Sequence, residues 1–144
     1  MKTKLFSIFL FCTALCFGFA SCDSDYDESF SKDDIVGVGD LVHTDYSGTY
    51  KGEKEVWSED YEFEIRLEFL ADGTGVSYEY YNRRWIEDDE FTYTVSGNTL
   101  TIYDGDEKES AKIVTLTKST LSLFFTYKDG SDCEEWTDTY KRVM

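Results

Sequence analysis

Hydrophobic and polar residues alternate along much of this chain. The clearest run is 61–70, in which single Glu or Arg residues separate five apolar ones: Tyr61, Phe63, Ile65, Leu67 and Phe69. A period of two places the apolar side chains on one face of a strand and the polar side chains on the other. The run therefore predicts an antiparallel strand with one buried face and one solvated face.

Seven further segments have strand composition, rich in Tyr, Phe, Thr, Val and Ile, and Gly-containing turns separate most of them. These segments are 49–57, 76–81, 91–95, 100–102, 111–117, 120–128 and 134–143. With 61–70 they make eight strands, and nothing after the first 21 residues has a convincing helical pattern.

Eight sequential antiparallel strands predict an all-β fold, an up-and-down barrel, because closing the sheet removes its exposed edges. A two-sheet sandwich is the alternative. Twenty aromatic residues lie after position 21, enough to fill such an interior without metals or disulfides. We assign the barrel domain to residues 47–144.

Residues 1–21 have the pattern of a lipoprotein signal peptide. A short basic stretch precedes an apolar run, which ends at small residues before Cys22. The run is shorter than the roughly 20 apolar residues that a membrane helix needs. Phe19-Ala20-Ser21-Cys22 resembles the lipobox of bacterial lipoproteins, which implies acyl chains such as palmitate on Cys22. An ordinary secretory signal cut nearby is the alternative.

An acidic stretch follows Cys22 and predicts a solvated tether over residues 22–46. Acid directly after a lipidated cysteine also resembles the signal that sends some Gram-negative lipoproteins across the outer membrane. We therefore expect a lipid-anchored outer-membrane protein at the cell surface, with the periplasmic face as second choice. Membrane attachment would be through the acyl chains on Cys22.

The charge balance excludes nucleic acids as partners. The whole chain has a net charge of −16, and without residues 1–21 it keeps 12 basic and 30 acidic residues, a net charge of −18. Such a surface repels the phosphates that nucleic-acid-binding proteins neutralise with Lys and Arg. It also repels anionic lipid headgroups.

The sequence offers little catalytic or metal-binding chemistry. Cys133 is the one cysteine left for the folded part, so no intrachain disulfide forms. His43, the single histidine, is expected on the tether and has no Cys or His at zinc-ligand spacing. The acidic groups 87–90 and 104–107 lack calcium-loop spacing. We predict a non-enzymatic protein with no catalytic residues, metal or cofactor.

Several segments together resemble the lipocalin-like domains of bacterial surface lipoproteins. They read GTYKG at 48–52, FLADGTG at 69–75, FTYTVSGNTLTI at 91–102, VTLT at 114–117, LSL at 121–123 and YKRV at 140–143. The family usually has Trp where Tyr50 or Tyr93 stands here. The resemblance implies a calycin-type barrel over residues 47–143 and implies no particular ligand.

Four tyrosines are the candidate ligand-facing residues: Tyr78, Tyr80, Tyr93 and Tyr127. An eight-stranded barrel is just wide enough to be packed solid or to hold one small molecule. If these tyrosines face inward, their flat faces and hydroxyls suit a small apolar or amphipathic ligand. The alternative is that they complete the core or its rim.

A second candidate is the segment containing Arg83, Arg84 and Trp85, which is expected as a loop between strands and precedes a run of acids. Trp85 would anchor an envelope protein partner, as Trp often does at interfaces. A solvated hairpin is the alternative. A small-ligand binder predicts a cavity inside the barrel, whereas an interaction module or inhibitor predicts a filled barrel with an exposed patch.

Overall fold

The computed structural model describes residues 28–143, so Cys22 and the expected signal peptide lie outside the described residues. The described chain forms one short helix and nine strands. They are α3 (Lys32–Ile35), β1 (Gly37–Tyr50), β2 (Glu53–Asp60), β3 (Ile65–Phe69), β4 (Thr74–Tyr81), β5 (Arg84–Ser96), β6 (Thr99–Asp104), β7 (Glu107–Leu116), β8 (Thr120–Asp129) and β9 (Asp132–Val143).

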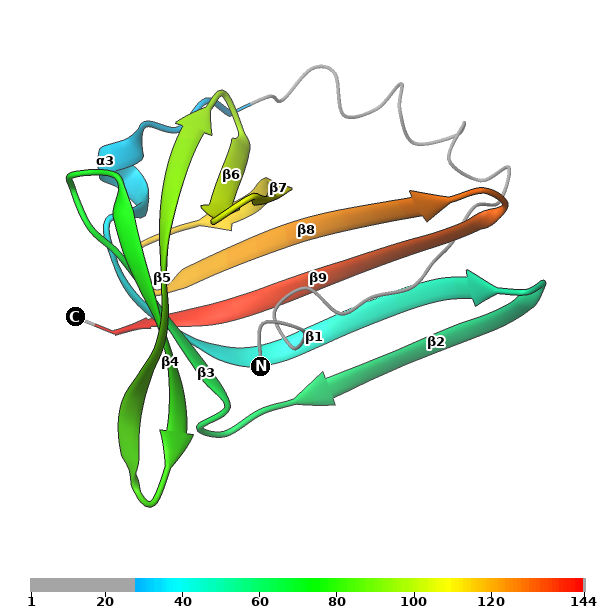
Figure 1. Ribbon diagram of the computed structural model, residues 1–144, viewed down its shortest axis with the longest axis horizontal. Helices are drawn as coiled ribbons and strands as arrows, with labels where there is room; N and C mark the ends of the chain where they lie inside the picture. The colour runs from blue at the N-terminus through cyan, green and yellow to red at the C-terminus, as the bar shows by residue number, and fades with distance from the viewer. Residues whose placement is uncertain (1–27, 144) are drawn as a thin grey trace.

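Eight of these strands close an antiparallel barrel, which confirms the predicted fold class (Figure 1). Strand β1 pairs with β3, each strand from β3 to β9 pairs with the next, and β9 pairs back with β1 from Val38 to Thr49. Strand β2 pairs only with the outer half of β1, from His43 to Tyr50. It therefore extends the wall beyond the barrel.

The core lies inside the barrel and is built from alternate residues of each strand. In β3, Ile65, Leu67 and Phe69 are buried and their neighbours are not, as the alternation predicts. The Phe69 ring packs edge-on against Phe91 and Tyr93, with centroids 5.5 and 5.0 Å away. Such edge-to-face pairs are a favoured aromatic geometry.

The alternation predicted across 61–70 fails at its start. Phe63 has a left-handed backbone, with φ of 60°, and its side chain is half exposed. This backbone state breaks the strand, so β3 begins only at Ile65. Tyr61 lies before the break and packs partly buried against the core.

Two other predicted segment boundaries are wrong. The segment 49–57 spans the end of β1 and most of β2, because Lys51 and Gly52 turn the chain with φ of 49° and 84°. The segment 83–90 is not a loop. Asn82 and Arg83 form a two-residue turn with positive φ, as hairpin turns require, and β5 begins at Arg84.

The folded domain begins earlier than residue 47. Ile35 belongs to the core, with 2% of its surface exposed, and β1 starts at Gly37. The tether predicted over 22–46 is therefore wrong from α3 onward, and the expectation of no helix fails for this one turn. His43 lies within β1, not on a tether, and its ring nitrogens are 2.6 Å from Asp60 and 3.2 Å from Asp45.

One end of the barrel is closed by α3 and the chain ends near it. The Arg142 guanidinium donates hydrogen bonds to the carbonyls of Thr117 (2.8 Å), Val36 (2.9 Å) and Asp34 (3.3 Å). The Phe30 amide donates to Gly97 on the adjoining β5–β6 turn. The opposite end, which we call the mouth, is where the β1–β2 and β4–β5 hairpins project (Figure 1).

Candidate functional site

The four candidate tyrosines do not surround a shared space. Tyr93 is in the core, 3% exposed, and its hydroxyl donates to the Leu70 carbonyl at 2.6 Å. Tyr127 lies near the end of β8 and is 52% exposed. Tyr78 and Tyr80 are on the outer face. The prediction of an inward-facing set is therefore wrong for Tyr78 and Tyr80, and Tyr127, although on the same face of β8 as Leu123 and Phe125, lies too near the end of the strand to be enclosed.

The register between β3 and β4 explains why Tyr78 faces outward. Leu67, which is buried, pairs with Ser77, so the next residue pair, Arg66 and Tyr78, lies on the outside. The Tyr78 hydroxyl donates to Glu68 at 2.7 Å, and this bond is the main cause that raises the pKa of Tyr78 to about 12. The sequence pattern of β4 alone does not reveal which of its faces is inside.

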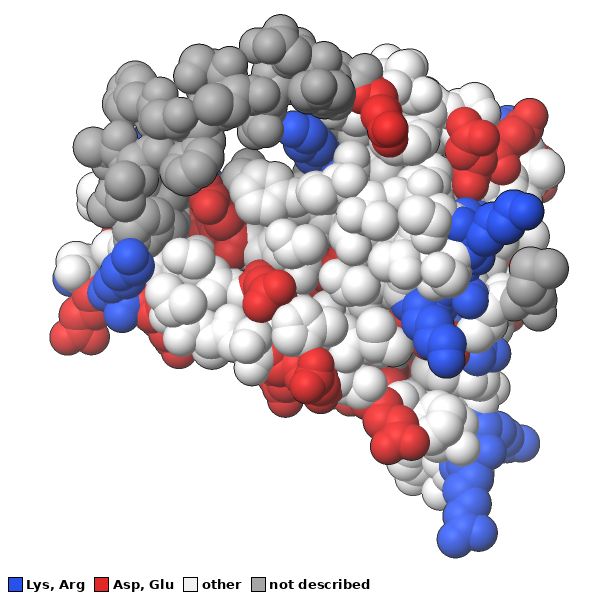
Figure 2. All heavy atoms as spheres, turned by 180° about the vertical axis from the view of Figure 1, so that it is seen from behind, with Lys and Arg blue, Asp and Glu red and all other residues white. Residues whose placement is uncertain are grey.

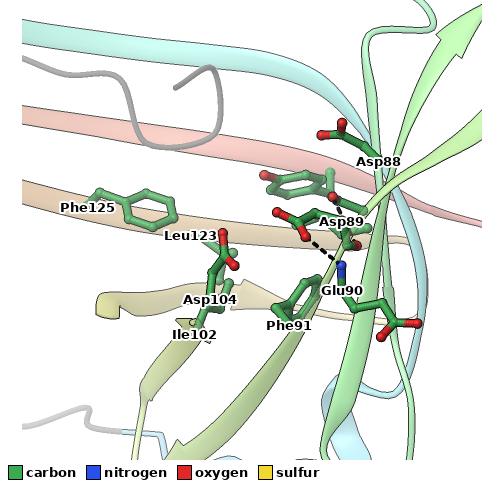
Figure 3. Close-up of a pocket in the computed structure, with 11 residues that line it drawn as sticks. Asp88, Asp89, Glu90, Phe91, Ile102, Asp104, Leu123 and Phe125 are labelled. Carbon is green, nitrogen blue, oxygen red and sulfur yellow. Dashed lines mark hydrogen bonds between the residues drawn. The ribbon is translucent and has the colours of Figure 1, made fainter. Parts of the chain in front are cut away.

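The barrel interior is nearly filled. Its inner space has a volume of about 30 Å³ and is lined mainly by apolar core residues such as Leu67, Phe91 and Leu123. In Figure 3, Asp89 and Asp104 point toward one another across this space. Because about 10–15 Å³ suffices for a water molecule, the space has room for water but not for an organic ligand. The predicted tyrosine-lined interior cavity is absent from the described barrel.

A larger space lies at the mouth, beside the β1–β2 hairpin, and we call it the mouth pocket. Its volume is about 290 Å³, close to the lower end of ligand sites. It is lined by Leu41, Thr44, Tyr46, Trp57, Glu59, Tyr61, Glu64, Ile65, Trp136, Asp138 and Tyr140. These residues come from β1, β2, β3, β9 and the connection between β2 and β3.

Aromatic rings form one wall of the mouth pocket. Tyr46 on β1 pairs across the sheet with Trp57 on β2 and with Trp136 on β9. The rings of Tyr46 and Trp57 are stacked, with centroids 4.9 Å apart. Trp136 stacks in turn on Phe125 of β8 at 5.0 Å. The row exists because each of these residues occupies the inward position of its strand.

Carboxylates supply the polar part of the mouth pocket. Asp138 accepts hydrogen bonds from the Thr44 hydroxyl, at 2.7 Å, and from Trp136. Burial raises the pKa of Asp138 to about 6. Glu59 accepts from the Tyr61 hydroxyl at 3.3 Å, and Glu64 lines the same space. Among residues 28–143, no group of three or more His, Cys, Asp or Glu is arranged to hold a metal.

Two further acids near the mouth have raised pKa values. Burial, followed by the charge of Asp138, raises the pKa of Glu109 on β7 to about 7. Burial raises the pKa of Glu134 on β9 to about 8, and its oxygens have no hydrogen-bond partner among the described residues. The inner surface at this end of the barrel is therefore acidic.

A family model for the lipocalin-like domain matches residues 35–123, which is more than half of the chain. The chain belongs to the lipocalin-like domain family. The match confirms the resemblance seen in the sequence and begins where the core begins, at Ile35. Barrels of this family are typically binding folds rather than enzymes.

Among solved structures, the lipocalin-like domain is similar to an uncharacterised protein from Bacteroides eggerthii. The two are 13% identical with a TM-score of 0.49, over 75% of this chain and 98% of that chain. No curated protein matches the chain. Within residues 28–143, no helix is long and apolar enough to cross a membrane.

On the outer face of this lipocalin-like domain, Trp85 belongs to an aromatic cluster with Phe63 and Tyr80, whose centroids are 6.4 and 5.2 Å away. The guanidinium of Arg66 lies 4.4 Å from the Trp85 ring centroid and donates two hydrogen bonds to Asp40. We call Phe63, Tyr80, Trp85 and Arg66 the outer cluster. The cation that contacts the Trp85 ring is therefore Arg66, which belongs to β3, whereas Trp85 belongs to β5.

Arg83 and Arg84, grouped with Trp85 in the sequence, lie at the exposed end of the β4–β5 hairpin. Figure 2 shows basic side chains at the tip of this projecting hairpin and acidic side chains along the adjoining lower edge. Because Arg84 and Trp85 are neighbours in one strand, their side chains point to opposite faces. The three residues therefore do not form one surface.

Sequence reasoning missed the aromatic and acidic residues of the mouth pocket. A signal was present, since Trp57 and Glu59 are two residues apart, as are Trp136 and Asp138. Each pair places a ring and a carboxylate on the same face of a strand. That the two pairs lie on either side of β1 depends on register, which one sequence does not specify.

Proposed function

We propose that this lipocalin-like domain binds a small amphipathic ligand at the mouth pocket rather than inside the barrel. The observation that carries the proposal is a space of about 290 Å³ with aromatic rings on one side and carboxylates on the other. Pockets of this kind combine apolar walls with a few polar groups that orient the ligand. The interior space of about 30 Å³ offers no alternative of sufficient size.

We further propose that acyl chains on Cys22 anchor the protein to the outer membrane, with the barrel displayed at the cell surface. The lipobox-like sequence and the acidic residues after it support this. The described chain reaches the barrel at its closed end, through Phe30 and α3. The mouth is at the end opposite α3, so an anchor that precedes α3 in the chain would leave it accessible.

Mass spectrometry of the protein recovered intact from its native membranes tests both proposals. We expect an N-terminal acylated Cys22 and a co-purified small molecule. The molecule should be lost from W57A, which removes a wall of the mouth pocket, and retained by W85A, which changes a tryptophan outside it. An unmodified mature N-terminus elsewhere contradicts the anchor, and equal retention by both variants contradicts the site.

The second candidate function is protein interaction through the outer cluster. The observation that favours it is the half-exposed Phe63, which is held in a left-handed backbone conformation against Tyr80. Exposed aromatic residues are common anchors of interfaces. In cross-linking on native membranes, a partner of this kind would be lost from W85A and kept by W57A, the reverse of the ligand result.

A further inference from the structure

We propose that the ligand of the mouth pocket is an organic cation, an ammonium group carrying an apolar substituent. The ammonium would lie between the carboxylates of Asp138, Glu59 and Glu64 and the facing aromatic wall, and its substituent would lie along that wall of Trp57, Tyr46 and Trp136. This inference rests on the proposed function and adds the charge and chemical class of the ligand.

The charges around the pocket select a cation. Three carboxylates line it, and in the described part of the chain the lining residues of the mouth pocket and of the inner space beneath it include no Lys or Arg. Glu109 and Glu134 lie near the same end, but their pKa values, raised to about 7 and 8, keep them largely protonated near neutral pH, so the charge comes from the three lining carboxylates. An anionic ligand would be repelled, whereas the charge of −18 outside the signal raises the local concentration of cations.

The aromatic rings of the mouth pocket also favour a cationic ligand. Trp57 is 38% exposed and Tyr46 stacks beneath it, so an aromatic face remains available at the edge of the pocket. Ring faces carry negative potential and attract ammonium groups, most strongly on Trp and when water is excluded. A mixed wall of rings and carboxylates is therefore better matched to an ammonium than to a neutral apolar group.

A neutral sugar is the main competitor, because sugars also stack on aromatic rings. The polar groups of the pocket, however, are mainly hydrogen-bond acceptors. Asp138 already accepts from Thr44 and Trp136, and Glu59 accepts from Tyr61. A neutral ligand that covers these carboxylates removes their water without supplying a compensating charge, which is costly. An ammonium supplies that charge.

Calorimetric titration of the purified protein with three probes tests the proposal. 2-Phenylethylammonium, 2-phenylethanol and phenylacetate share a ring and a similar length, but their head groups are positive, neutral and negative. We expect the cation to bind about tenfold or more tightly than the alcohol, in line with a cation–π contact in a partly dry site. Phenylacetate should not bind detectably.

A pair of double variants assigns the effect to the pocket. E59Q/E64Q neutralises two lining carboxylates and should weaken binding of the cation about tenfold while leaving the alcohol unchanged. E53Q/E62Q is the matched control. It removes the same charge from exposed positions of the same strand and connection, which do not line the pocket. In this control the affinity for the cation should change by no more than about twofold, because only the long-range attraction of two distant charges is lost.

The outcomes separate this inference from the proposed function. Equal affinities for the cation and the alcohol, or binding of the neutral disaccharide maltose in place of the cation, overturn the inference and leave a ligand site at the mouth. If both double variants weaken binding of the cation equally, the inference is also overturned, because the attraction would then come from the net charge of the protein and not from the pocket. No binding of any of the four probes overturns both proposals.

Discussion

Gly75 shows how closely the barrel interior is packed at the level of a single atom. A Cβ at this position would lie 2.2 Å from the Phe91 ring and 2.7 Å from the backbone oxygen of Glu68. The ring therefore occupies the space that a side chain at position 75 would need. This contact fills the barrel beneath the mouth and contributes to excluding a ligand from the interior.

We expect G75A to destabilise the protein by roughly 1–3 kcal/mol, the range typical of overpacked cores. Chemical denaturation followed by tryptophan fluorescence measures the change. F91L replaces the ring with a smaller aliphatic side chain, so G75A should destabilise the F91L protein clearly less than it destabilises the wild type. An unchanged unfolding midpoint for G75A would contradict the close packing described for Phe91.

At the scale of elements, β2 differs from the other strands. All eight of its residues are exposed, and it has a paired neighbour, β1, on one side. Trp57 holds it to the molecule by stacking on Tyr46. We therefore expect β2 to be the more mobile outer wall of the mouth pocket and β9, which is paired on both sides, to be the more rigid one.

Hydrogen exchange should show this difference directly. Amides of β2 are expected to exchange at least about a hundredfold faster than those of β9, which corresponds to a difference of roughly 3 kcal/mol in the free energy of opening. Peptide-resolved mass spectrometry measures it. Equal protection of the two strands would mean that β2 is an integral part of the barrel.

The closed end depends on Arg142, whose guanidinium connects the β7–β8 turn to the region of α3. R142A should cost about 2 kcal/mol of stability, since hydrogen bonds from a charged donor are lost. It should also expose the segment before β1 to proteases. R83A, at the tip of the β4–β5 hairpin, is the control and should behave as wild type. Unchanged protection of α3 in R142A would show that the contacts of Ile35 and Phe30 hold the segment without Arg142.

The periodicity of the sequence predicts the barrel because it depends on local physics. Alternation in 65–69 and the Gly turns at 97, 105 and 130, all with positive φ, locate β3 and three hairpin turns correctly. The turn at Asn82-Arg83 has no such signal and was missed, and the turn at Lys51-Gly52 was missed although it contains a glycine with positive φ. The start of the domain was also missed, since the short segment from Ile35 to Gly39 gains its stability from tertiary packing.

The site was less predictable than the fold, because it depends on which face of each strand is inside. Tyr78 and Tyr80 were placed inside from their alternate spacing, but Ser77 occupies the inner position. A shift of one residue in register moves every side chain to the other face. The same limit concealed the row of rings that crosses from Trp57 to Trp136.

At the scale of the whole molecule, buried acids couple stability to pH. The pKa values of Asp138, Glu109 and Glu134 are raised to about 6, 7 and 8, so the folded state binds protons more tightly than the unfolded chain. His43 acts in the same sense, since its pKa is raised by hydrogen bonds to Asp60 and Asp45. Repulsion among the excess acids adds to the effect.

Stability should therefore be greatest near pH 5 and fall as the pH rises to 8, because ionising these groups in the folded state is unfavourable. For Asp138 alone the decrease between pH 5 and pH 8 is about 1.4 kcal/mol, because the rest of its effect lies below pH 5. Thermal unfolding at a series of pH values measures it. D138N should flatten the curve, and D106N, at an exposed turn, should not. A protein more stable at pH 8 than at pH 5 would contradict this account.

The central claim is that a ligand binds at the mouth and not on the outer cluster or in the interior. The three tryptophans report on it directly, since Trp57 and Trp136 line the mouth pocket and Trp85 lies in the outer cluster. The measurement is the shift of their indole N–H resonances in a ¹⁵N–¹H correlation spectrum when 2-phenylethylammonium is added. We predict that the signals of Trp57 and Trp136 move and that of Trp85 stays. A shift of Trp85 with the other two unchanged would contradict the claim.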